Sequence, residues 1–132
     1  MPLTALYAAL LAPIFLVLSL RVITGRRDGR VALGDGGDPG LLRRMRVHAN
    51  FAEYVPLALI LIGLAESLGT ARWILDALGI TLLAARLLHA YGVSQQQENF
   101  ALRVAGMIAT ITVIATAALA CLLGALSRGI GL

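Results

Sequence analysis

Four long apolar segments, separated by short polar stretches, dominate the sequence. They cover about residues 3–24, 41–68, 71–91 and 100–126. An α-helix crosses the roughly 30 Å of hydrocarbon in a bilayer with about 20 residues, so each segment is long enough to span a membrane. Backbone groups in lipid must be hydrogen-bonded within their own segment, which favours helices over strands. The pattern therefore predicts an all-α membrane protein, a four-transmembrane-helix bundle in a single domain over residues 1–132.

Two of the connections between these segments are strongly polar. Residues 25–40 are rich in glycine, aspartate and arginine, and residues 94–99 read SQQQEN, so both are predicted to be loops outside the membrane. The first apolar run begins directly after Met1, without a basic region or a small-residue cleavage site in front of it. We therefore interpret the first segment as a retained span and not as a cleaved signal.

The composition and the placement of charge agree with this topology. The chain is 59% hydrophobic and only 14% charged, whereas soluble domains carry about 25% charged residues. All 11 basic residues are arginines, and two of them, Arg72 and Arg128, fall at the end that holds the second loop. The other nine fall at the opposite end: Arg21, Arg26, Arg27, Arg30, Arg43, Arg44, Arg46, Arg86 and Arg103. The positive-inside bias therefore predicts that the first and third loops are cytoplasmic.

The same features argue against several other functions. The net charge is +4, but the arginines flank apolar segments, where anionic headgroups explain them better than nucleic acid does, so no nucleic-acid partner is expected. With two histidines, one cysteine and no paired carboxylates, the chain predicts no metal site and no intrachain disulfide. The glycines at 34–40 lack the Lys-Ser/Thr ending of a phosphate-binding loop.

The fourth segment is rich in small residues spaced four apart, such as Ala105 with Ala109 and Ala120 with Gly124. Small residues at this spacing let helices approach closely in lipid. Two interpretations stay open: packing inside one chain, or contact between subunits. Because four helices alone give polar side chains little shelter, we expect the protein to form an oligomer.

The most informative stretch lies in the second segment. Arg46, Asn50 and Glu53 are four and three residues apart, so they share one helix face, and Asn50 can bridge the two charges. Glu53 lies about two turns inside the helix, where an ionisable group costs about 2.5 kcal/mol or more unless it faces protein or water. Pro56 has no N–H, which frees the carbonyl of Ala52 next to Glu53. We interpret this face as a functional site; the alternative is an Arg–Asn–Glu network that only joins helix to helix.

Two further clusters lie at the same membrane depth. Arg86 and His89 are three residues apart near the end of the third segment, and Arg103 is the only charge near the start of the fourth. Each has a plainer alternative, because the arginines can extend to lipid headgroups and His89 can be a hydrogen-bonded core residue. All the clusters together predict a basic pocket with one carboxylate. Such a pocket suits a ligand with carboxylates and an ammonium or amide donor, since guanidinium groups bind carboxylates in a bidentate way.

These residues resemble a known family. The run SLRVITGRR at 19–27, a short loop with glycine and proline, and RVHANFAEYVP at 46–56 are similar to the MAPEG proteins, the membrane-associated proteins in eicosanoid and glutathione metabolism. That family includes the leukotriene-forming synthase, microsomal prostaglandin E synthase, microsomal glutathione transferases and the lipoxygenase-activating protein. Its most specific pattern is represented here by Arg46, Asn50, Glu53 and Pro56. The resemblance covers the whole chain and is firmest over residues 19–60. The short loops and the absence of lysine fit a bacterial-type member in an inner membrane.

The resemblance implies a homotrimer that binds glutathione between neighbouring subunits near the cytoplasmic face. The candidate cofactor-binding residues are Arg26, Arg46, Asn50, Glu53, Tyr54, His89 and Tyr91. Arg103 falls where the family has the arginine that stabilises the glutathione thiolate, which makes it the candidate catalytic residue. The chain departs from the family one turn later, where Met107 stands in place of a frequent tyrosine.

The resulting functional prediction is a membrane-embedded, glutathione-dependent transferase or peroxidase-type protein. It would act on hydrophobic electrophiles that arrive through the lipid bilayer, by means of an activated glutathione thiolate. Because the family also has non-catalytic members, the alternative is a binding or scaffold protein with the same pocket and no turnover. A further alternative is a small transporter or a packing protein whose charges pair only internally.

Overall fold

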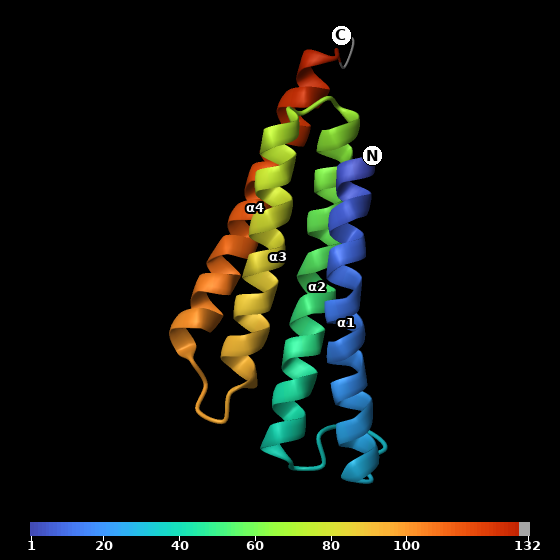
Figure 1. The fold of residues 1–132 in the computed structure, drawn as a ribbon, viewed down its shortest axis with the longest axis vertical. Helices are drawn as coiled ribbons and strands as arrows, with labels where there is room; N and C mark the ends of the chain where they lie inside the picture. The colour runs from blue at the N-terminus through green and yellow to red at the C-terminus, as the bar shows by residue number, and fades with distance from the viewer. Residues whose placement is uncertain (130–132) are drawn as a thin grey trace.

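The computed structural model describes residues 1–129, which form four long antiparallel helices in one bundle (Figure 1). The helices are α1 (Pro2–Asp28), α2 (Pro39–Ser67), α3 (Arg72–Ser94) and α4 (Phe100–Ser127). All four are long and apolar enough to cross a membrane. The predicted all-α architecture with four candidate membrane spans is therefore confirmed.

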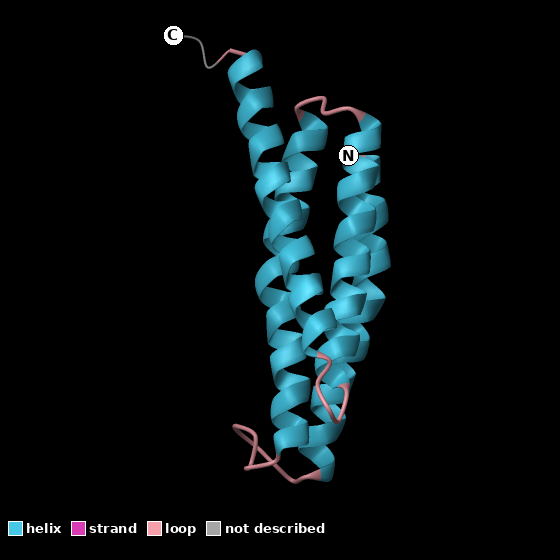
Figure 2. Ribbon diagram, turned by 90° about the vertical axis from the view of Figure 1, so that its left-hand side faces the viewer, coloured by secondary structure: helices cyan, strands magenta, loops and turns pink. Residues whose placement is uncertain are grey.

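The two middle helices hold the bundle together. Both α1 and α4 pack against α2 and α3, but α1 and α4 do not contact each other within residues 1–129. Figure 1 shows α1 and α4 on opposite sides of the bundle. The α1–α2 and α3–α4 loops lie at one end, and the α2–α3 turn and the N-terminus lie at the other (Figure 2). We call the first of these the arginine-rich end, because nine of the 11 arginines lie toward it in the sequence.

A narrow apolar strip on each helix forms the core. On α2 the buried residues Val47, Phe51, Val55, Ala58 and Ile62 recur every three or four positions, which is one helix face. The outward faces of the helices carry many large apolar side chains that are exposed in the single chain. A soluble bundle would place polar residues there. Lipid or a neighbouring subunit must therefore cover these outward faces.

Polar loop residues define where α2 and α4 begin. Oδ1 of Asp38 accepts a hydrogen bond of 2.8 Å from the Gly40 N–H. Pro39 is the first helical residue, a position whose N–H has no partner inside the helix, so the N–H that proline lacks is not needed there. Oδ1 of Asn99 accepts a hydrogen bond of 3.1 Å from the Leu102 N–H. Each side chain thus caps an N–H group that has no partner inside the helix. Both polar stretches predicted as loops lead into such a cap.

The first helix is longer than predicted and extends to Asp28. Gly25 lies against α2, because a Cβ there would come within 3.0 Å of Arg44 Nη1 and 3.1 Å of Leu41 Cδ1. Nη1 of Arg44 also donates a hydrogen bond of 3.3 Å to the Arg21 carbonyl. Contact with α2 therefore keeps the last turn helical where glycine and charge predicted a loop.

Small residues let α4 pack closely within the chain. A Cβ on Gly106 would lie 2.7 Å from the Ala85 carbonyl oxygen and 2.8 Å from His89 Cβ, which is too close for any side chain. A Cβ on Gly124 would lie 2.9 Å from Leu68 Cβ. At these two positions the structure supports packing inside one chain, the first of the two interpretations of this helix.

Glu66 joins the start of α1 to the end of α2. Its carboxylate accepts hydrogen bonds from the Leu3 N–H at 3.0 Å, the Thr4 N–H at 2.9 Å and the Thr4 hydroxyl at 2.6 Å. We expect Glu66→Ala to lower the free energy of unfolding by about 1–2 kcal/mol, because α1 loses bonds to a charged group. Unfolding by sodium dodecyl sulfate in mixed micelles measures this effect. Asp28→Ala, an exposed carboxylate at the arginine-rich end, is the control, and equal midpoints for both variants would contradict the prediction.

Candidate functional site

A polar cavity of about 270 Å³ opens at the arginine-rich end between α2 and α4, with α3 beneath it. Its walls are formed by Pro39, Leu42, Arg43, Arg46, Asn50, His89, Val93, Glu98 and Arg103. We call it the α2–α4 pocket. Three helices and the α3–α4 loop contribute to it, so its shape depends on how the bundle packs.

The wall from α2 carries two arginines and an asparagine on one helix face. Arg43, Arg46 and Asn50 are three and four residues apart, which places them on successive turns. Nη1 of Arg43 donates hydrogen bonds of 2.9 and 3.1 Å to the carbonyls of Gln95 and Gln96. Arg43 therefore ties α2 to the α3–α4 loop, while Arg46 stays exposed at the pocket.

Arg86 lies fully buried beneath the pocket. Its Nη2 donates a hydrogen bond of 2.6 Å to Asn50 Oδ1 and lies 3.3 Å from His89 Nδ1. Its Nη1 donates a longer bond of 3.4 Å to the Thr110 hydroxyl, and its guanidinium carbon lies 5.6 Å from the centre of the Phe51 ring. One arginine thus orients an amide and an imidazole that both line the pocket.

The charge of Arg86 has no carboxylate partner within 4 Å in the described part of the chain. Its Nε is buried, and no acceptor among residues 1–129 binds it. A charge held away from water without a counter-ion is costly, and such groups in membrane helices usually mark a functional site. The pocket floor therefore carries a positive charge that has no counter-ion among the described residues.

The wall from α4 holds an ion pair. Nη1 of Arg103 lies 2.7 Å from Glu98 Oε1, and the Arg103 side chain is 47% exposed. Glu98 precedes the helix and Arg103 lies in its first turn, so both reach the same pocket wall. With Arg43, Arg46, Arg86 and Arg103 against one carboxylate, the pocket is strongly positive and favours an anionic ligand.

The structure brings four of the predicted site residues together in the α2–α4 pocket: Arg46, Asn50, His89 and Arg103. Asn50 does not bridge Arg46 and Glu53, as the spacing suggested; its side-chain oxygen binds Arg86 on the neighbouring helix. From the sequence, Arg86 and His89 formed only a weak pair, and both ligand binding and extension of Arg86 to the headgroups stayed open. The signal that could have revealed its role is the presence of Asn50 and Thr110 at the same depth on the two adjacent helices.

The remaining predicted residues lie outside this pocket. Glu53 is exposed and forms no ion pair within residues 1–129, and Tyr54 beside it is half-buried. Arg26 lies between α1 and α2, where its Nη2 is 3.5 Å from Met45 Sδ. Tyr91 is 61% exposed. It is two residues after His89 on α3, so the two side chains point to nearly opposite sides of the helix. A single chain therefore assembles only part of the predicted site.

The chain is similar to known membrane proteins. The sequence model of the MAPEG family matches residues 4–123. The inner membrane protein YecN of Escherichia coli strain K12 is 41% identical over 107 residues, which cover 81% of this chain and 80% of the relative. YecN of Escherichia coli strain CFT073 matches to the same extent. The four apolar helices and these relatives indicate an integral protein of a bacterial inner membrane. The chain belongs to the MAPEG family.

Proposed function

We propose that the α2–α4 pocket binds glutathione and activates its thiol for reaction with hydrophobic electrophiles. The observation that carries this proposal is the convergence of Arg46, Asn50, His89 and Arg103 above the buried cation of Arg86. Glutathione carries two carboxylates, one ammonium group and a thiol. Guanidinium groups bind carboxylates well, and a glutamate suits an ammonium group, so the polar groups of the pocket complement the polar groups of the tripeptide.

We further propose that the functional unit is a homotrimer in which a neighbouring subunit completes the site. Glu53 supports this, because an exposed carboxylate in an apolar span needs a partner or water. Arg26 supports it as well, since its buried Nη1 has no acceptor among the described residues. Glu53, Tyr54 and Arg26 would then contact glutathione held between two subunits. The first and third loops would face the cytoplasm, where glutathione is available.

The proposed chemistry is nucleophilic attack by the glutathione thiolate. A free thiol has a pKa of about 8.5 and is mostly protonated at neutral pH, and a nearby guanidinium lowers that pKa. The thiol proton leaves to solvent, a sulfur–carbon bond forms, and the leaving group departs with its electron pair. Arg103 is the residue proposed to stabilise the thiolate, while Arg46, Asn50 and Glu53 position the tripeptide.

Two observations favour a second candidate function, a binding or scaffold protein without turnover. The Arg103 guanidinium is paired with Glu98 at 2.7 Å, which weakens its field at a bound sulfur. Met107 also stands where the family often has a tyrosine. Both candidates require the same pocket, so glutathione binding is the property to test first.

The test is a thermal-shift titration of the purified protein with glutathione and with an S-alkyl glutathione. We expect both to raise the melting temperature, since a ligand at 100 times its Kd stabilises the folded state by about 2.7 kcal/mol. Arg46→Gln should reduce this rise, whereas Arg27→Gln, an exposed arginine outside the pocket, should not. Native mass spectrometry of the same samples should show three chains with bound glutathione. No shift in the wild-type protein would contradict the proposal and favour a transporter or packing role.

A further inference from the structure

A second hollow lies on a different side of the bundle, between α1 and α3, and has a volume of about 430 Å³. We call it the α1–α3 groove. It shares no residue with the α2–α4 pocket. Its walls are apolar along most of their length, with Pro13 and Val17 on α1 and Leu87 on α3. Only its mouth is polar, where Arg21, Tyr91 and Ser94 meet.

The mouth of the groove holds an arginine in a fixed position. Nη1 of Arg21 donates a hydrogen bond of 2.9 Å to the Ser94 hydroxyl. No carboxylate among residues 1–129 lies within 4 Å of the Arg21 guanidinium. Arg44 is close by, since its Nη1 binds the Arg21 carbonyl at 3.3 Å. The mouth is therefore positively charged and lacks an anion.

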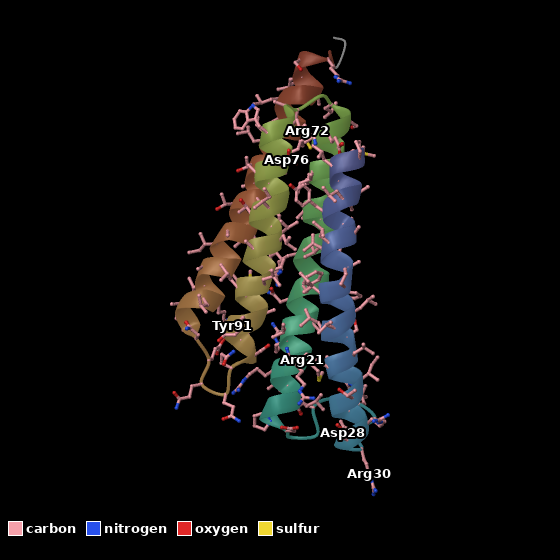
Figure 3. All side chains as sticks on the ribbon, in the orientation of Figure 1. Arg21, Asp28, Arg30, Arg72, Asp76 and Tyr91 are labelled. Carbon is pink, nitrogen blue, oxygen red and sulfur yellow. The ribbon has the colours of Figure 1, made fainter. Side chains whose placement is uncertain are left out.

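The length of the groove along α1 fits within one leaflet of a bilayer. Ser94 is the last residue of α3, so Arg21, which binds it, lies at the level where that helix ends. From Arg21 to Pro13, α1 rises about 12 Å, while one leaflet of the hydrocarbon core is about 15 Å thick. Figure 3 shows Arg21 and Tyr91 near the arginine-rich end of the bundle. The polar mouth thus lies at headgroup level and the apolar walls extend into the hydrocarbon.

We propose that the α1–α3 groove is a binding site for an anionic phospholipid of the leaflet at the arginine-rich end. The phosphate accepts hydrogen bonds from Arg21, Tyr91 and Ser94, and one acyl chain lies along the apolar walls. Charge complementarity selects the lipid class, because a cation without a counter-ion favours a headgroup with net negative charge over a zwitterionic one. The hydrogen bond to Ser94 distinguishes this arginine from one that extends freely to any headgroup.

This site is independent of the proposed glutathione pocket. The two hollows lie between different helices. Within residues 1–129, Arg21 forms no hydrogen bond or ion pair with a residue that lines the α2–α4 pocket. Lipid binding can therefore be measured whether or not the protein binds glutathione.

The experiment is native mass spectrometry of the detergent-purified protein mixed with equal amounts of phosphatidylglycerol and phosphatidylcholine that have the same acyl chains. We expect the wild-type protein to retain mainly phosphatidylglycerol. Arg21→Gln should lower that retention about fivefold and lower the retention of phosphatidylcholine much less. Arg27→Gln is the matched control, because Arg27 is on the same helix, is exposed and pairs with Asp28 at 3.8 Å. Leu87→Trp should fill the groove and lower the retention of both lipids.

Three results would overturn the proposal. Equal phosphatidylglycerol retention by the wild-type and Arg21→Gln proteins would show that ordinary surface lipid was measured. Displacement of the lipid by water-soluble glycerophosphate would indicate a free phosphate site that needs no acyl chain. A change in the number of subunits in Arg21→Gln, without a change in lipid retention, would assign the groove to a contact between copies of the chain.

Discussion

Replacing Arg86 with methionine should weaken glutathione binding by about tenfold or more, the equivalent of about 1.4 kcal/mol. The guanidinium holds the Asn50 amide at 2.6 Å and places a buried positive charge beneath the α2–α4 pocket. In the variant the amide is free to rotate and the pocket floor is neutral, so an anionic ligand loses both orientation and attraction. The two losses act in the same direction, which makes a tenfold loss a low expectation.

The same substitution should leave the unliganded protein about as stable as before. Burial of the Arg86 charge is costly, and replacement of buried charges by apolar residues of similar size is often neutral or stabilising by about 1–4 kcal/mol. Methionine is flexible and can fill the space beside Phe51. The lost bonds to Asn50 and Thr110 act in the opposite direction. In folding, the relief from burying a charge and the loss of these bonds oppose each other. In glutathione binding, the loss of the Asn50 orientation and the loss of the positive charge are both unfavourable.

Thermal melting with and without glutathione separates the two effects. Arg72→Met is the matched control, because Arg72 is an exposed arginine at the other end of the bundle, 3.6 Å from Asp76. Arg86→Lys should bind glutathione with intermediate affinity, since it keeps the charge but has no planar fork. Unchanged glutathione affinity in Arg86→Met would contradict the role of Arg86 in binding, and a much lower melting temperature without ligand would contradict the expected stability.

Arg103→Ala should lower the kcat for conjugation of an aryl halide about 100-fold, a loss typical of removing one group that stabilises developing or bound negative charge. Glutathione affinity should change far less, because Arg103 is half-exposed and an exposed ion pair contributes only about 0–1 kcal/mol. The thiol of bound glutathione should show a higher pKa in the variant, since a cation near the sulfur favours the thiolate. Thiolate absorbance of the complex as a function of pH measures this shift.

Glu98→Gln should have the opposite effect to Arg103→Ala on the positive field at the thiol. Removal of the carboxylate 2.7 Å from Arg103 strengthens the positive field at the sulfur. The pKa of the bound thiol should then fall, and the pH–rate profile should shift to lower pH. Equal profiles for Glu98→Gln, Arg103→Ala and the wild-type enzyme would exclude Arg103 as the thiolate partner. Binding without turnover in the wild-type protein would support the scaffold function instead.

The helices could be predicted from sequence because lipid imposes strict rules on a spanning chain. An apolar run of about 20 residues has no alternative to a helix in hydrocarbon. Two of the predicted loops also contain the capping residues, Asp38 and Asn99, at which α2 and α4 begin. The end of α1 was predicted too early, because the contacts of Gly25 with α2 depend on tertiary packing that no local pattern reveals.

The site was predictable along each helix but not between helices. Spacing places Arg46 and Asn50 on one face, and both line the same pocket. It does not say which neighbouring side chain Asn50 meets, so Arg86 was not among the predicted ligand-binding residues. Glu53 shares that face in sequence yet forms no ion pair within the described chain, and its role as a glutathione ligand stays a prediction.

The absence of contact between α1 and α4 within residues 1–129 bears on how a hydrophobic molecule could reach the α2–α4 pocket from the membrane. Because α4 packs against α2 and α3 and not against α1 within residues 1–129, an outward tilt of α4 would not disturb α1. Near the pocket, α4 is joined to α3 by the hydrogen bond of 3.4 Å from Arg86 to the Thr110 hydroxyl, and the bonds from Arg43 to the carbonyls of Gln95 and Gln96 hold the loop that leads into α4. A sideways entrance from the hydrocarbon would then require movement of α4 against α2 and α3, while α1 could stay in place.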